Sequence, residues 1–226
     1  PARNPANPPP PPVGLIVRKN ARGQWFDDNR GDWTDLVSGV NASASGRLKG
    51  WDLPDRDLAI IDTASLDVSY ATRLMNLNMA LAVHPSGSVT VVGTDARNEV
   101  RFEPNANGRF LRVLMATVDP RRPSSSPVKD LNPHLDYATP TVPQSVRNLS
   151  IGDPRGVVWN ARGTRAFVTG LGSNNVVAVG QGGARLGQVE VGEGPTGIVL
   201  DAGRERLYVL NHFGASISVL NADRLE

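Results

Sequence analysis

Two stretches near the C-terminus decide the fold because they repeat each other: Gly156-VVWNARGTRAFVTGLGSNNVVAV-Gly180 and Gly197-IVLDAGRERLYVLNHFGASISVL-Asn221. They superpose without a gap at an offset of 41 residues, from Gly156 to Gly197. Ala80-LAVHPSGSVTVVGTDARNEVRF-Glu103 superposes on the first of them at an offset of 76 residues, again without a gap. The segment 119–154, rich in Pro, Ser, Asn and Asp, accounts for the longer offset. A repeat of this length indicates a repeat architecture.

The repeats share an internal order of short apolar runs and polar turns. In the second unit the runs are residues 157–159, 166–169 and 176–179, and a fourth run follows at 185–191. The first unit has its fourth run at 111–118. Runs of this length bounded by Gly and Asn are typical of strands and too short for helices. Four antiparallel strands in one repeat match a propeller blade, so the predicted fold is an all-β, β-propeller fold of four-stranded antiparallel blades.

The third unit carries a resemblance to a known family. Its Arg206-Leu-Tyr-Val-Leu-Asn211, a Gly turn and Ser216-Ile-Ser-Val-Leu220 resemble the YVTN family of bacterial β-propeller repeats. Gly194-Pro195-Thr196-Gly197 matches the entry to that unit, whereas the middle unit departs with Phe167-Val-Thr-Gly170. The resemblance implies a periplasmic or extracellular protein with a binding or scaffold role. It also implies a c-type haem module as a frequent neighbour.

An incomplete blade is predicted upstream. Residues 57–62 match a third strand, residues 66–71 a fourth, and residues 13–20 a second, with residues 21–56 inserted between second and third. With the last unit lacking its fourth strand, about three and a half blades are expected, which is half of a seven-bladed propeller. We therefore divide the chain into a Pro-rich linker at 1–12 and a partial propeller at 13–226. We expect a fragment, to which the remaining blades are added from outside this chain.

Both long inserts are expected on one face of the propeller. Connections from second to third strand, and from a fourth strand to the next blade, emerge at the same end of the sheets, which places residues 21–56 and 119–154 together. The candidate binding residues in these inserts and in the last second-to-third turn are Trp25, Trp33, Trp51, His134, Tyr137 and His212. The alternatives are that the indoles form the insert's own core and that the turn histidines, His84 among them, are solvated. No catalytic residue is assigned.

A cluster of oxygen-bearing side chains in the first insert gives a weak calcium hypothesis. Its members are Asp27, Asp28, Asn29, Asp32 and Asp35. Gly31 stands where an EF-hand loop has a ligand, and the segment also fits a charged, solvent-facing loop. Calcium is the one cofactor that the chain itself suggests.

Composition excludes several classes of site. The chain has 226 residues, 24 Lys and Arg against 22 Asp and Glu, a formal charge of +2 and no cysteine. Without cysteine, the chain has no disulfide, thiolate zinc site, iron–sulfur cluster or covalent c-type haem of its own, so haem would come from a part outside it. The small charge argues against nucleic acid as a partner, and no run approaches the ~20 apolar residues of a membrane span.

These observations favour an extracytoplasmic β-propeller module that presents two long loops to a partner or ligand, next to a redox (c-type haem) module. The expected partners are a protein or the remaining blades of the same propeller. Two alternatives stay open. One is part of a redox enzyme whose active site is completed outside this chain, although no enzyme activity is expected of this chain alone. The other is a structural cell-surface or adhesion protein.

The stacking of blades also predicts a core and little helix. Blades covered on both faces need near-continuous apolar strands. The residues expected to be buried are Val157, Trp159, Phe167, Val168, Val177, Val179, Ile198, Leu200, Tyr208, Val209, Ile217 and Val219. Outside the two inserts we expect negligible helix.

Overall fold

The computed structural model describes residues 16–28, 30–97, 111–137 and 142–226, so the Pro-rich segment 1–12 lies outside the described residues. The chain forms two compact units. One comprises Pro1–Pro54 with Ala96–Leu111, and the other comprises Asp55–Asp95 with Arg112–Glu226. Within the described residues, no helix is long and apolar enough to cross a membrane.

The first unit contains a short hairpin and two single helical turns. Strands β1 (Arg18–Lys19) and β2 (Trp25–Phe26) pair antiparallel. Helix α1 (Thr34–Val37) and the 3-10 turn η1 (Ala42–Ser45) follow. Trp25, Val37 and Ala42 are its buried apolar residues among those described. With so few buried side chains, the unit gains little of its stability from apolar burial.

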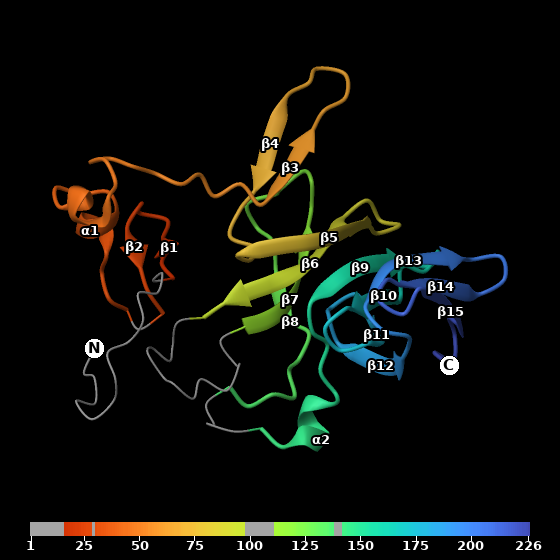
Figure 1. Ribbon diagram of the computed structural model, residues 1–226. Coiled ribbons are helices and arrows are strands. Elements are labelled where there is room, and N and C mark those ends of the chain that lie inside the picture. The colour runs from red at the N-terminus through yellow and green to blue at the C-terminus, as the bar shows by residue number, and fades with distance from the viewer. Residues whose placement is uncertain (1–15, 29, 98–110, 138–141) are drawn as a thin grey trace. The chain divides into compact units, whose positions relative to one another are not determined.

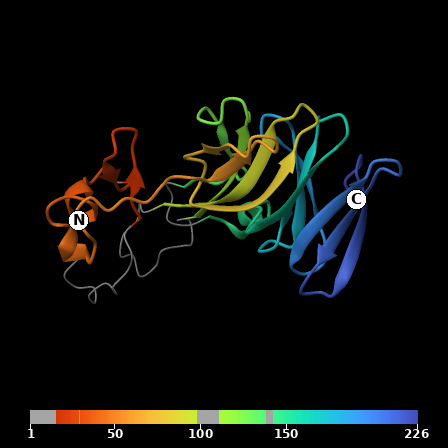
Figure 2. The ribbon, with the colours of Figure 1, turned by 90° about the horizontal axis from the view of Figure 1, so that it is seen from above.

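The second unit begins with a hairpin and a four-stranded sheet (Figures 1 and 2). The hairpin joins β3 (Leu58–Ile61) to β4 (Val68–Ala71). The sheet has the order β5-β6-β7-β8, and its strands are β5 (Leu77–Val83), β6 (Val89–Ala96), β7 (Leu111–Val118) and β8 (Val128–Asp130). A connection containing helix α2 (Gln144–Arg147) leads to the next sheet.

Two further sheets follow in the order that the repeats predict. One holds β9 (Pro154–Trp159), β10 (Ala166–Gly170), β11 (Asn175–Val179) and β12 (Arg185–Glu190). The other holds β13 (Pro195–Asp201), β14 (Arg206–Asn211) and β15 (Ser216–Asn221). All their neighbouring strands are antiparallel. Helices of the described residues lie only in segments 21–56 and 119–154, which confirms the prediction of negligible helix elsewhere.

The sheets are arranged as successive blades of a β-propeller. The first strand of each sheet contacts the first strand of the next, β5 against β9 and β9 against β13, while the later strands lie further out (Figure 1). This arrangement confirms the predicted all-β, partial propeller fold. Each blade therefore has the next one as a packing partner, which explains why its apolar positions occur on both faces of a strand.

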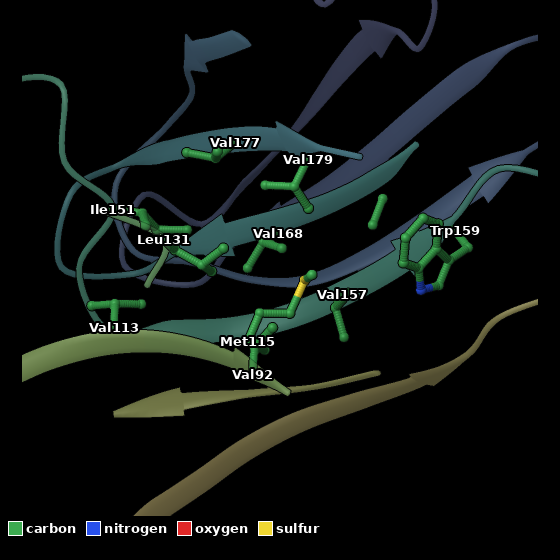
Figure 3. Packing of buried hydrophobic residues seen from close by; sticks show 11 residues of the cluster. Val92, Val113, Met115, Leu131, Ile151, Val157, Trp159, Val168, Val177 and Val179 are labelled. Atoms are coloured by element: carbon green, nitrogen blue, oxygen red, sulfur yellow. The ribbon is translucent and has the colours of Figure 1, made fainter. Parts of the chain in front are cut away.

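Apolar side chains fill the space between neighbouring sheets. Figure 3 shows the cluster between the β5–β8 sheet and the β9–β12 sheet, in which Met115, Val168 and Val177 are at most 1% exposed. A second cluster joins β3–β4 to the other face of the β5–β8 sheet, and a third joins the β9–β12 sheet to β13–β15. Each fully buried Val, Leu or Met contributes about 1.5–3 kcal/mol through removal from water.

The predicted core is confirmed for the middle sheet and partly wrong for the last one. Seven of the twelve predicted residues are buried: Val157, Trp159, Phe167, Val168, Val177, Val179 and Val209. Ile198, Leu200 and Tyr208 are half-buried. Ile217 and Val219 are 64% and 50% exposed, because the described residues cover β13–β15 on one face only.

Two strand assignments from the repeat pattern are wrong. Strand β7, which the pattern assigned as the fourth strand of its blade, is third in the sheet order, and β8 is the fourth. Strand β8 comes from within segment 119–154, so that segment is not entirely an insert. In the other case, Arg18 and Lys19 pair with Phe26 and Trp25 instead of joining β3 and β4 as a second strand.

Candidate recognition surface

The connection from β8 to β9 is closed by one buried asparagine. The Asn132 side chain donates from Nδ2 to the Ile151 carbonyl oxygen at 2.9 Å, and the Ile151 N–H donates to Asn132 Oδ1 at 2.8 Å. Both residues are buried. These two reciprocal hydrogen bonds resemble those between opposite residues of antiparallel strands. They hold Asn132 and Ile151, the two ends of the connection, against each other.

Strand β12 supports the same connection from the side. Arg185 donates from Nη1 to the Leu131 carbonyl oxygen at 3.0 Å and to Asn132 Oδ1 at 3.2 Å. Gln188 donates to the Asn148 carbonyl oxygen at 3.2 Å. Burial lowers the pKa of the Arg185 guanidinium, which still carries its charge at neutral pH. Side chains of the next blade therefore hold both the start and the later part of this connection.

His134, a predicted site residue, lies in this connection. Its Nε2 is 3.1 Å from Ser150 Oγ, and the Ser150 carbonyl oxygen accepts a hydrogen bond from Asn175 Nδ2 at 3.0 Å. Partial burial lowers the pKa of His134, and the Arg185 charge lowers it further. The imidazole is therefore held neutral at physiological pH.

Tyr137, another predicted site residue, lies against a cation. The Arg112 guanidinium carbon is 3.9 Å from the centre of the Tyr137 ring, and Arg112 Nη1 is 4.0 Å from an oxygen of Asp130. Burial raises the pKa of the Tyr137 hydroxyl, and the Asp130 carboxylate raises it further. An arginine between an aromatic face and a carboxylate is a favourable arrangement that orders all three groups.

His212 and Phe213, in the turn from β14 to β15, form an exposed pair of rings. Their ring centres are 5.4 Å apart, and Phe213 is 65% exposed. The His212 N–H donates to the Gly194 carbonyl oxygen at 2.9 Å, and the Phe213 N–H donates to the Glu193 carbonyl oxygen at 3.1 Å. A Cβ at Gly194 would lie 2.4 Å from the Phe213 ring, so glycine is needed for this close approach.

Backbone and side-chain hydrogen bonds join these segments into one rim. The Gly172 N–H donates to the Gly152 carbonyl oxygen at 3.0 Å. The Gly194 N–H donates to Asn174 Oδ1 at 2.9 Å. We call the described residues of the segments 131–153, 171–174, 191–194 and 212–215 the recognition rim. Among the predicted site residues, the rim contains His134, Tyr137 and His212.

The three predicted tryptophans belong to the first unit. Trp25 is buried, and its ring centre lies 6.0 Å from that of Trp51. Trp33 donates from Nε1 to Asp27 Oδ2 at 2.6 Å. These contacts agree with the alternative that the indoles form a small core of their own. A binding role for them, and the expected meeting of the two inserts on one face, stay predictions.

The calcium hypothesis concerns side chains that have protein partners. Asp27 accepts from the Gly31 N–H at 3.0 Å, and Asp28 is paired with Arg18 and lies 3.5 Å from Arg97. Asp35 accepts a hydrogen bond from Asn41 Nδ2 at 2.5 Å. Asp32 accepts a hydrogen bond from the Thr34 N–H, and its hydrogen bonds to Thr34 lower the pKa of its carboxyl group. Asn29 lies outside the described residues. No group of three or more described histidine or acidic side chains could hold a metal ion. Calcium stays a prediction.

Sequence reasoning missed a buried histidine at the other end of the sheets. His84 follows β5 in a turn, where a solvated side chain is expected, but it is 7% exposed and stacks edge-on against Trp159. Its neighbours come from residues about 75 and 97 positions later, Trp159 and Gln181, so no local pattern could have indicated them.

Comparisons with known proteins show the fold alone. No protein-family model and no curated protein matches this chain. Among solved structures, Kuenenia stuttgartiensis hydrazine synthase is similar with 15% identity and a TM-score of 0.57 over 77% of this chain and 54% of that one. The propeller domain of Cps50 (Swd1) from Myceliophteria thermophila has 13% identity and a TM-score of 0.48, over 72% and 46% of the two chains. The chain thus spans about half the length of the structures it resembles.

Proposed function

We propose that this chain is a β-propeller binding module that recognises a partner through the recognition rim. One observation carries the proposal: an exposed aromatic pair, His212 and Phe213, is held by backbone hydrogen bonds at the rim. Exposed aromatic side chains are enriched among the residues that dominate binding energy at protein interfaces. Phe213 is 65% exposed, and hydrogen bonds of the His212 and Phe213 backbone set its position.

The order of the neighbouring connection supports the same role. Asn132 and Arg185 fix the connection that carries His134 and Tyr137. A loop that is ordered before binding loses less conformational entropy on association, which raises its affinity for a given set of contacts. The rim therefore combines two segments held by hydrogen bonds, around Asn132 and around Ile151, with an exposed aromatic pair.

The proposal includes the first insert and a location. Residues 21–56 would form a second recognition loop through Trp25, Trp33 and Trp51. The resemblance of the last unit to YVTN repeats supports a periplasmic or extracellular location and a neighbouring c-type haem module. Fractionation of the source cells with an antibody to this chain tests the location. A Cys-x-x-Cys-His segment in the complete reading frame, together with a haem stain, tests the haem module.

The binding role is tested by comparing variants at the two ends of the sheets. His212→Ala combined with Phe213→Ala removes the aromatic pair, whereas Arg162→Ala changes an exposed residue in the β9–β10 turn at the opposite end. Each protein is immobilised and exposed to a membrane-free extract of the source organism, and bound proteins are quantified by mass spectrometry. We expect a partner whose recovery falls about tenfold with the rim variant and is unchanged with Arg162→Ala.

Equal recovery from all three proteins would contradict the proposed rim. A fourth protein, in which a Gly-Ser linker replaces residues 21–56, tests the second loop in the same way. If it recovers the partner at the wild-type level while the His212 and Phe213 variant does not, recognition is confined to the rim of the second unit.

A further inference from the structure

The outward face of the β13–β15 sheet is apolar and uncovered by the described residues. Cross-strand pairing places Val199 opposite Tyr208, Tyr208 opposite Val219, and Leu210 opposite Ile217. Four of these side chains are 48–64% exposed: Leu210, Val219, Val199 and Ile217. Contiguous exposed apolar side chains on a regular sheet mark an interaction surface.

The same positions of the preceding blade form an interface. Forty-one residues before this face lie Val158, Phe167, Thr169, Val176 and Ala178, on β9, β10 and β11. Phe167, Val176 and Ala178 are at most 2% exposed. They pack against Leu207, Val209 and Leu220 of the β13–β15 sheet. Each repeat therefore uses this face to receive the repeat that follows it.

A glycine gives an independent sign of the same use. At Gly156 of β9, a Cβ would lie 2.4 Å from the Thr196 carbonyl oxygen, so glycine lets the backbone of β13 approach closely. The equivalent glycine of the last blade is Gly197, where a Cβ would meet only the Leu210 Cβ, at an ordinary 3.8 Å. At Gly156 the space next to the glycine is filled by the first strand of the following sheet. At Gly197 none of the described residues fills the equivalent space.

We propose that the outward face of β13–β15 is a docking surface for one further sheet of the same 41-residue repeat. That sheet would place its first strand against Gly197 and Val199. Its inner face would carry apolar residues at the positions equivalent to Ile198, Leu207, Val209 and Leu220, which make the corresponding contacts with the β9–β12 sheet. A further sheet of the same repeat has these apolar positions at the right spacing, whereas nothing in the sequence of an unrelated protein would place them there.

The proposal is tested by supplying such a sheet within the chain. Glu226 is equivalent to Arg185, so a second copy of residues 186–226 placed after Glu226 continues the repeat without a shift. Because the chain has no cysteine, Val219→Cys introduces a single thiol in the centre of the face. The measurement is the rate at which a maleimide labels this thiol in the original and in the extended chain.

We expect labelling to be slower by about tenfold or more in the extended chain, since the reagent must then wait for the interface to open. Gly197→Val in the extended chain is the matched control. It blocks the close approach and should restore fast labelling, whereas in the original chain it should leave the rate unchanged, because Gly197 there has room for a Cβ. Trypsin should likewise remove the appended residues slowly from the extended chain and rapidly from its Gly197→Val variant.

Equal labelling rates in the two chains, or rapid removal of the appended residues by trypsin, would overturn the proposal. It would also be overturned if labelling of the original chain slows as its own concentration rises, with a dimer in sedimentation. That result would make a second copy the occupant of the face.

Discussion

The imidazole Nε2 of His84 lies 2.8 Å from the carbonyl oxygen of Gly163 and joins two neighbouring blades. The Ser86 N–H donates to His84 Nδ1 at 3.0 Å, so Nδ1 is an acceptor and the proton is on Nε2, which donates to Gly163. The ring meets Trp159 edge-on, with centres 4.6 Å apart. Trp159 in turn donates from Nε1 to Thr90 Oγ1 at 2.9 Å, which gives a second connection between the same two blades.

Replacement of this histidine should weaken the contact between blades. His84→Ala leaves the Gly163 carbonyl without its donor and opens a cavity beside Trp159, so we expect the free energy of unfolding to fall by about 2–4 kcal/mol. Urea denaturation followed by Trp fluorescence measures the change. His212→Ala, which removes an exposed ring, should change it by less than about 0.5 kcal/mol. Similar losses for both variants would show that His84 has no special role.

Gly163 should tolerate no side chain, because of its positive φ and because of the His84 ring beside it. Gly87 shares only the first of these properties and so separates their effects. The φ of Gly163 is +66°, and a Cβ there would lie 2.4 Å from His84 Nε2. Gly87 has a φ of +89° but no neighbour within 4 Å of a Cβ. We expect Gly87→Ala to cost about 1–2 kcal/mol from backbone conformation alone, and Gly163→Ala to cost about 1–3 kcal/mol more from the clash. Equal costs in thermal denaturation would mean that the His84 ring can move aside.

Asn132 should control the order of the recognition rim. Asn132→Ala leaves the buried Ile151 N–H and C=O without partners, which we expect to cost about 2–5 kcal/mol. Amide exchange measured by mass spectrometry should then accelerate in residues 142–151 and remain slow in the β9–β12 sheet. Gln144→Ala, at an exposed position of α2, is the matched control. If exchange of the connection is unchanged in Asn132→Ala, other contacts hold the rim.

Acid should destabilise the rim through His134. Its pKa is lower in the folded chain than in the unfolded chain, because burial and the Arg185 charge disfavour the imidazolium. The stability it contributes is therefore fully present above the unfolded pKa of about 6.5 and is lost as the pH falls toward the folded pKa. We expect the urea midpoint to fall more between pH 7.5 and pH 5 in the wild type than in His134→Gln. At neutral pH the urea midpoints of the two proteins should differ only by the effect of replacing His with Gln. If the two plots of midpoint against pH are parallel, His134 is not the titrating group.

The repeat made the two C-terminal blades predictable because each of their strands has an apolar run and a Gly or Asn turn at an equivalent position. Strand β8 escaped because its three residues include one apolar side chain, Val128, among prolines and serines. A short strand at the edge of a sheet, covered on one face only, can form without a longer run of alternating apolar residues. The prediction of a second strand at residues 13–20 was wrong for the opposite reason, since an apolar run fits a strand without showing which strand it pairs with.

The site was less predictable than the fold. Strand direction predicted that His134 and His212 belong to the same end of the blades, because the type of connection decides the end at which a turn lies. The contacts that order the rim depend on pairs such as Asn132 with Ile151 and Arg185 with Leu131, whose partners are 19 and 54 residues apart. Such pairs are produced by packing of blades and carry no signature in local sequence.

The one-sided packing of β13–β15 makes the second unit a short linear array, in which each blade is stabilised mainly by its neighbours. In such an array cooperativity is limited, and opening starts at the member with the fewest interfaces. The Trp159 side of the β9–β12 sheet and the Phe167 side are both covered, so among the described residues this blade has two interfaces where β13–β15 has one. Amide protons of β14 should therefore exchange through a local opening that leaves β10 closed, although the two strands have nearly the same pattern of residues. Equivalent blades of one repeat would then differ in lifetime because of their place in the row.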